Sequence, residues 1–277
     1  MIQKNKHAVA ILLATYNGEK FLREQLDTIF GQDEGDFTLY VRDDGSTDGT
    51  LAILEDYSSR HANMILIDNE GCSLGPQMNF MELLWLVESD YYMLADQDDL
   101  WHADKVRNSL SKLRQMESET DGPALVLTNM RLCDGDGRVM SESFWKSIRF
   151  APAVFHDLRS YVFINFATGC TMMFNHRVKD VAFPVPAYSP MHDWWLTVCV
   201  YRNGGKVGFI AEPQMDYRKH GGNVTGNFVA TQSGKTLLVR IKELQSLYRL
   251  ARKCQVVKTF FDFLYHKYRI NHLRATL

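Results

Sequence analysis

The feature that most constrains the fold is a pattern that repeats through the first ~130 residues. A short apolar run comes first, a cluster of polar residues follows, and a segment with helical spacing comes next. Residues 9–14, 37–41, 64–67 and 91–95 are such runs, and their length and continuity are typical of strands buried on both faces. Strands that alternate with helices predict an α/β fold with an open, mostly parallel sheet.

Each of the four runs ends in a polar cluster. In open parallel sheets, ligands bind at the carboxyl ends of the strands. We therefore expect one shared site at this edge of the sheet. The clusters occupy residues 15–19, 43–48, 71–79 and 96–99.

The fourth run is followed by three carboxylates within four residues, Asp96, Asp98 and Asp99. Three acids released at a strand end repel one another unless a cation or a set of donors neutralises them. A divalent metal that carries a diphosphate would do so, because Mg²⁺ prefers oxygen ligands and keeps positions open for phosphates. The alternative is a solvated acidic loop in which Asp99 or Asp104 caps the next helix.

The rest of the chain is less regular, and residues 131–165 show no clear periodicity. Further helices are expected over residues 21–30, 48–60, 79–87, 103–116 and 191–202, and further strands over residues 124–127, 167–174 and 207–210.

Charge separates the end of the chain from its body. From Lys235 onward ten Lys or Arg face only Glu243 and Asp262, a net +8, so the rest of a chain of net charge −2 carries −10. We expect a main domain over residues 1–230 and a tail of basic amphipathic helices over residues 231–277. The tail would pack on the body or on another subunit, or lie on a membrane surface. An acidic body makes nucleic acid a poor partner.

Composition indicates a globular protein of the cytoplasm. Hydrophobic residues make up 45% of the chain and aromatic residues 12%, enough for a sizeable core. The five cysteines are odd in number and form no C-x-x-C pair, which fits a reducing compartment. No apolar run approaches the ~18 residues of a membrane span, and residues 1–7 do not look like a signal peptide.

Several motifs, taken together and in this order, resemble the inverting family 2 glycosyltransferases with the GT-A (Rossmann-like) fold. The resemblance spans about residues 9–226, and its last motif resembles a bacterial rhamnosyltransferase-like branch. The motifs are V-A-I-L-L-A-T-Y-N-G at residues 9–18, D-D-G-S-T-D-G-T at 43–50, A-D-Q-D-D-L-W at 95–101, H-D-W-W at 192–195 and Y-R-K-H-G-G-N-V at 217–224.

The resemblance implies a nucleotide-sugar donor, a nucleotide-binding half over about residues 1–130 and an acceptor-binding half over about residues 131–230. A carboxylate can accept the pyrimidine N3–H, and a tyrosine ring can pack on the base. Alternatively, residues 44–50 form only a turn that caps the next helix. The nucleotide-binding residues that the resemblance implies are Thr15, Tyr16, Glu19, Asp43, Asp44, Asn79 and Asp96, the last at the ribose or the metal.

The resemblance also implies a metal site. Asp98 would ligate Mg²⁺ or Mn²⁺ that bridges the phosphates, His220 would complete the shell or contact the diphosphate, and Arg218 would pair with phosphate. The plainer alternative for the stretch around Arg218 and His220 is a glycine-rich surface loop.

Inversion needs one general base, and Asp193 matches the acidic residue that has the catalytic role in the family. The family often has Glu-Asp here, so the His192-Asp193 pair of this chain makes His192 a rival base. Trp194 would desolvate Asp193, form a platform for the acceptor sugar, or belong to the core.

We therefore expect transfer of a sugar, from dTDP-rhamnose before UDP-hexoses, to a bacterial polysaccharide or lipid-linked glycan, with the chain cytoplasmic or on the inner face of the plasma membrane. Two rivals are a nucleotidyltransferase that makes sugar nucleotides and a non-catalytic glycan-binding module. The first would need a basic, glycine-rich loop after the first strand, where this chain has one glycine and no base within residues 14–19. A Rossmann dehydrogenase is excluded because no G-x-G-x-x-G is present there.

Overall fold

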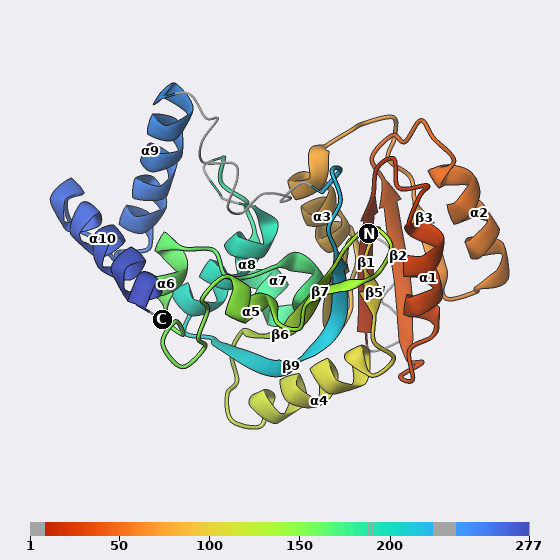
Figure 1. The fold of residues 1–277 in the computed structure, drawn as a ribbon, viewed down its shortest axis with the longest axis horizontal. Coiled ribbons are helices and arrows are strands. Elements are labelled where there is room, and N and C mark those ends of the chain that lie inside the picture. The colour runs from red at the N-terminus through yellow and green to blue at the C-terminus, as the bar shows by residue number, and fades with distance from the viewer. Residues whose placement is uncertain (1–8, 188, 190, 224–236, 277) are drawn as a thin grey trace.

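The computed structural model describes residues 9–187, 189, 191–223 and 237–276 (Figure 1). It shows an α/β fold in which one curled, mixed sheet is flanked by helices, as the sequence predicts. The sheet has nine strands in the order β3-β2-β1-β4-β8-β6-β9-β5, and β7 pairs with β6.

The first half of the sheet is parallel, and all of its strands except the one at the edge, residues 64–67, are buried on both faces. Its register places Thr15 opposite Asp43 and Leu13 opposite Ala95, so the carboxyl ends of three strands lie level. The expected shared edge is thus present. The strands of this half are β1 (Val9–Thr15), β2 (Phe37–Asp43), β3 (Met64–Ile67) and β4 (Tyr91–Ala95).

The second half mixes strand directions. β8 (Met172–Asn175) runs antiparallel to both β4 and β6 (Ala124–Cys133), whereas β9 (Lys206–Arg218) runs parallel to β6. The expectation of a mostly parallel sheet therefore describes the strands before residue 100. After β6 the chain turns back through β7 (Val139–Ser141) and the short helix α5 (Phe144–Ser147), in the region without periodicity.

The long strand β9 curls back toward the polar edge. Its register against β6 shifts on both sides of Asn129, which marks bulges that bend the strand. Its end then pairs with β5 (Leu100–Trp101), with Met215 opposite Trp101 and Asp216 opposite Leu100. The residues after β9 therefore lie beside the turn that follows β4. This turn contains Asp96, Asp98 and Asp99 and is called the acidic turn below.

Helices flank the sheet on both sides. In Figure 1, α1 and α2 lie on one side of β1–β3 and α3 lies on the other, next to α8. Amphipathic spacing explains α1, which buries Leu22, Leu26 and Ile29. The helices are α1 (Leu22–Phe30), α2 (Thr50–Arg60), α3 (Gly75–Leu86), α4 (Lys105–Glu117), α6 (Leu158–Phe163), α7 (His176–Ala182) and α8 (His192–Arg202), and η1 (Gly169–Thr171) is a 3₁₀ turn.

Helix starts differ slightly from expectation. The α2 helix begins at Thr50 because Asp48 stands before it and accepts hydrogen bonds from the Thr50 amide (3.0 Å) and hydroxyl (2.5 Å). The α3 helix begins at Gly75 with a proline in its first turn, four residues before the expected start. Asp104 occupies the position before α4, but its side chain makes no capping bond.

The end of the chain forms a helical hairpin of α9 (Leu237–Lys253) and α10 (Phe260–Thr276) that packs against α6. Phe263 is fully buried there, with its ring 5.4 Å from that of Phe163. Packing on the body is thus one role of the tail. The predicted boundary at residue 231 lies outside the described residues, as do residues 1–7. Across the described residues, no helix has both the length and the apolar character of a membrane span.

Phe263 and Phe261 offer a matched test of this packing, because Phe261 is 83% exposed on the same helix. Phe263→Ala is expected to lower the free energy of unfolding by about 3 kcal/mol, since it leaves a cavity between the hairpin and α6. Phe261→Ala is expected to change it by less than about 0.5 kcal/mol. Urea denaturation of both variants measures the difference, and equal losses would contradict the packing.

Candidate active site

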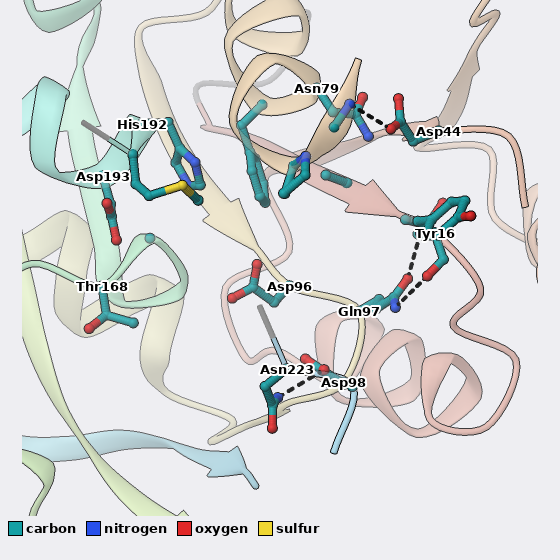
Figure 2. A pocket seen from close by; sticks show the side chains of 18 of the residues that line it. Tyr16, Asp44, Asn79, Asp96, Gln97, Asp98, Thr168, His192, Asp193 and Asn223 are labelled. Atoms are coloured by element: carbon teal, nitrogen blue, oxygen red, sulfur yellow. Dashed lines mark hydrogen bonds between the residues drawn. The ribbon is translucent and has the colours of Figure 1, made fainter. Parts of the chain in front are cut away.

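A cavity of about 420 Å³ opens at the polar edge of the sheet (Figure 2). On the side of β1, β2 and α3 it is lined by Thr15, Tyr16, Asp44 and Asn79. From the middle and the far side it is lined by Asp96, Asp98, His192 and Asp193. Most of the predicted site residues are therefore brought together, although Glu19, Asp43, Trp194, Arg218 and His220 do not line the cavity.

Asp43 holds the turn after β2. Its carboxylate accepts hydrogen bonds from the hydroxyls of Thr15 (2.8 Å) and Ser46 (2.6 Å) and from the amides of Gly45 (3.0 Å) and Ser46 (2.7 Å). These donors occupy both oxygens. Asp43 therefore has a role in the turn, and its predicted contact with the nucleoside stays a prediction.

Asp44 lines the cavity and is also bound by the loop that precedes α3. One oxygen accepts from the Leu74 amide (2.7 Å) and the other from the Gly75 amide (2.8 Å) and the Ser73 hydroxyl (2.9 Å). Burial alone would raise the pKa of Asp44, but these donors and Arg42 lower it below its usual value. Asp44 is thus a fixed negative charge in the wall of the cavity.

Asn79 acts through Arg42. Its amide oxygen accepts from the Arg42 guanidinium (2.8 Å), and its amide nitrogen donates to the Arg42 carbonyl (3.1 Å). Arg42 is itself buried and pairs with Asp44 at 3.1 Å. Sequence reasoning missed Arg42, and the available signal was a charged residue inside an otherwise apolar strand.

Tyr16 is fixed by its backbone and free at its ring. Gln97 accepts from the Tyr16 amide (2.8 Å) and donates to the Tyr16 carbonyl (3.0 Å), which joins the loop after β1 to the acidic turn. The Tyr16 side chain is 55% exposed. Glu19, by contrast, accepts from the Gly49 amide (2.9 Å). Glu19 thus holds the turn before α2, and its predicted contact with the nucleoside stays a prediction.

The acidic turn carries two cavity carboxylates whose pKa values are raised. Burial and the charges of Asp98 and Asp193 raise the pKa of Asp96 to about 7. Burial also raises the pKa of Asp98, against the opposing effect of His220. Asp98 Oδ2 lies 2.7 Å from His220 Nε2 and accepts from the Asn223 amide at 3.3 Å. The predicted metal residues Asp98 and His220 therefore meet directly.

This donor set fits a divalent cation. Carboxylate groups suit Mg²⁺ or Mn²⁺, and the charge of Asp98 raises the pKa of Asp96, which shows an excess of negative charge. Possible ligand atoms of Asp96, Asp99 and Cys170 also lie within 4.8 Å of one another. Asp99 and Cys170 are buried and do not line the cavity, so the accessible set is Asp96, Asp98 and, beside it, His220.

Arg218 supports the acidic turn from behind. It is 3% exposed, and its guanidinium donates to the carbonyls of Asp98 (3.2 Å) and Gly135 (3.1 Å) and pairs with Glu24 (2.7 Å). In this structure Arg218 therefore positions Asp98, and its predicted pairing with phosphate stays a prediction.

Asp193 lies in the first turn of α8 and faces the cavity (Figure 2). Its Oδ1 accepts from the Trp194 amide (2.6 Å) and from the Asn165 side chain (3.3 Å). Burial raises its pKa to about 6, and these hydrogen bonds oppose the rise. Such a carboxylate is ionised at neutral pH and can still accept a proton. Nothing in the sequence singled out Asn165.

His192 is buried against Phe80, with the ring centroids 4.4 Å apart. Burial lowers its pKa to about 3. Its ring nitrogens make no hydrogen bond within the described part of the chain, and a side chain at Gly169 would meet Nε2 at 2.8 Å. An imidazole with so low a pKa is a weak base, which favours Asp193.

The two tryptophans of the motif pack away from the cavity. The Trp194 indole donates to the Tyr161 carbonyl, and the Trp195 indole donates to the Ala182 carbonyl at 2.8 Å. Trp195 is 5% exposed and belongs to the core. Trp194 does not line the cavity, and a role as a platform for the acceptor sugar stays a prediction.

Comparison with known proteins agrees with this geometry. Residues 10–178 match the model of glycosyl transferase family 2. The dTDP-rhamnosyl transferase RfbG of Shigella flexneri is 36% identical over 229 residues, which cover 77% of this chain and 73% of that protein.

Solved structures show the same fold. Residues 1–349 of Staphylococcus aureus TarS in complex with UDP-GlcNAc superpose with a TM-score of 0.62 at 21% identity, over 90% of this chain and 65% of that one. The mannosyltransferase PcManGT of Pyrobaculum calidifontis, in complex with GDP-Man and Mn²⁺, gives 0.59 at 18% identity, over 94% and 68%. The present chain thus spans just under two thirds of the TarS fragment. With more than half of its length matched by the family model, the chain belongs to glycosyl transferase family 2.

Proposed function

We propose that the chain transfers a sugar, with inversion, from a nucleoside diphosphate sugar to a hydroxyl of a bacterial polysaccharide or lipid-linked glycan. The observation that carries this proposal is that Asp193 and the acidic turn face one cavity. Asp193 is close enough to Asp96 for its charge to raise the pKa of that carboxyl. A base and a diphosphate seat on opposite sides of one cavity are what inverting transfer requires.

The donor would enter with its base toward the end of β1. The exposed Tyr16 ring offers a flat face for a pyrimidine, and the backbone of Tyr16 is held in place by Gln97. The favoured donor is dTDP-rhamnose, because the 36% identical relative is named a dTDP-rhamnosyl transferase. UDP-hexoses come next, since the fold is shared with a complex of UDP-GlcNAc.

Asp98 and His220 would hold a divalent cation with Asp96 beside them. Such a cation, when bound, offsets the negative charge that grows on the departing diphosphate. The protein contributes a turn that is already fixed, since Arg218 binds the Asp98 carbonyl and Asn223 binds the Asp98 carboxylate. The leaving group therefore meets a site that needs little rearrangement.

Asp193 would act as the general base. Its carboxylate removes the proton of the acceptor hydroxyl while that oxygen forms a bond to the anomeric carbon. The bond between the anomeric carbon and the phosphate oxygen breaks on the opposite face, and its electron pair leaves with the nucleoside diphosphate. An acceptor assembled on a lipid carrier would place this reaction at the inner face of the plasma membrane.

Donor binding is tested by melting the protein with dTDP-rhamnose, UDP-hexoses and GDP-mannose, with and without Mn²⁺. A ligand at about 100 times its Kd stabilises the native state by about 2.7 kcal/mol, which corresponds to a rise in Tm of roughly 5–10 °C. Asp98→Asn is expected to abolish the part of the rise that depends on Mn²⁺. The control is Asp121→Asn, because that side chain is 95% exposed just before β6, at the edge of the sheet opposite the cavity. Absence of a shift with every donor would contradict the proposal.

Asp193→Asn is expected to lower kcat by a factor of about 10²–10⁴ because it removes the base while keeping the shape of the side chain. The rise in Tm with donor should remain. Release of nucleoside diphosphate, with a glycolipid extract as acceptor, measures the rate. His192→Gln is the comparison, and a larger loss there than at Asp193 would assign the base to the imidazole.

The rate should also report the pKa of Asp193. The base works only when ionised, and its pKa of about 6 means that protonation removes it as the pH falls below that value. We expect kcat/KM to be level above about pH 7 and to fall roughly tenfold per unit below about pH 5.5. A pH series at saturating Mn²⁺ measures this. A fall only near pH 4, the usual range of a carboxyl group, would show that Asp193 is not perturbed during catalysis.

A further inference from the structure

We propose that one face of α10 docks onto a membrane surface rich in anionic phospholipids. This surface, the α10 outer face, consists of Phe261, Leu264, Tyr265 and Tyr268. The inference concerns a region outside the active site and does not depend on the donor or on the reaction. In Figure 1 the α9–α10 hairpin forms the end of the molecule that lies farthest from β1–β3.

The α10 outer face is apolar and open to solvent. Phe261 is 83% exposed, Leu264 40%, Tyr265 57% and Tyr268 68%. Their spacing of three and four residues puts them on a single stripe of the helix. The core of the hairpin is satisfied without them, because Phe263 on the other side of the helix is fully buried. A continuous stripe of this kind marks an interaction surface.

Two cations border this stripe. Lys258 and Arg269 are exposed, and the Arg269 guanidinium lies 5.7 Å from the centroid of the Tyr265 ring. The exposed His272 ring stacks on Tyr268 at 6.0 Å. The acid in this part of the helix, Asp262, is engaged by the Lys258 amide (2.9 Å) and by His266 (3.1 Å). Aromatic rings beside cations match the chemistry of a membrane interface, where rings enter the headgroup layer and cations meet lipid phosphates.

The charge of the whole chain would orient the contact. The residues from Lys235 onward carry +8 and the rest of the chain carries −10. Exposed cations continue along α9 at Lys242, Arg249, Arg252 and Lys253. An anionic surface therefore attracts the hairpin and repels the acidic body, so the two effects favour the same orientation.

The same charges argue against pairing of two copies through this face. A two-fold interface brings each patch against itself. Arg269 and Lys258 would then face the same cations of the second copy, with Asp262 already engaged on its own helix. Phospholipid phosphates supply the missing negative charge, and acyl chains supply the apolar environment.

The test is sedimentation of the full chain with vesicles of phosphatidylcholine, alone or mixed with phosphatidylglycerol. We expect binding to the mixed vesicles that weakens as salt is added, and little binding to phosphatidylcholine alone. The triple variant Phe261→Ser, Tyr265→Ser, Tyr268→Ser should lower the partition coefficient at least roughly tenfold. Lys258→Glu with Arg269→Glu should lower it by at least about as much.

Matched controls lie on the body. Met140→Ser removes an apolar side chain that is 63% exposed, and Arg138→Glu reverses a cation that is 81% exposed. Both should bind vesicles like the unmodified chain. An unchanged Tm and an unchanged response to nucleotide sugar would show that the variants are folded. The proposal is overturned if the unmodified chain does not bind mixed vesicles or if the triple variant binds equally well. It is also overturned if light scattering shows a dimer that the triple variant abolishes.

Discussion

Neutralising the acidic turn after β4 is the requirement on which the rest of the structure depends. Asp99 and Lys105 are both fully buried, and the charges of Asp99 and Asp96 support the ammonium form of Lys105. Burial lowers the pKa of Lys105 to about 8, so the cation is costly to keep there. The Lys105 ammonium donates to the Cys170 carbonyl at 2.5 Å, and η1 also borders the catalytic side of the cavity. One buried cation thus compensates the rear of the turn and connects it to the loop beside Asp193.

The curl of β9 meets the same requirement from another direction. A flat parallel strand would leave Arg218 far from the loop after β4, whereas the bulged strand returns it to the Asp98 carbonyl at 3.2 Å. His220 follows two residues later and reaches the Asp98 carboxylate at 2.7 Å. The mixed half of the sheet therefore has a function. It delivers one cation behind the turn and one imidazole in front of it.

The sequence predicted the carboxyl edge because a buried strand and its terminal polar residues leave a local signal. Asp98, His220 and Asp193 were predicted by resemblance, and the structure brings them to or beside one cavity. For Asp43 the predicted contact with the nucleoside stays untested, because a motif shows that a carboxylate is present but not which donors surround it. Its own turn supplies the amides of Gly45 and Ser46, which no residue pattern separates from a ligand. The mixed half of the sheet was missed because bulges and strand reversals depend on tertiary packing.

Adjacent residues at the start of α8 show how burial assigns a chemical role. Removal from water disfavours the charged form of any group, so it raises the pKa of an acid and lowers that of a base. His192 is thereby held neutral, because its pKa falls to about 3, and the pKa of Asp193 rises to about 6. The helix start and the Trp194 amide limit the rise in the pKa of Asp193, since both favour its charged form. Burial thus makes the imidazole a weak base and raises the pKa of the neighbouring carboxyl toward neutral pH. The proposed removal of a proton from a sugar hydroxyl needs such a pKa.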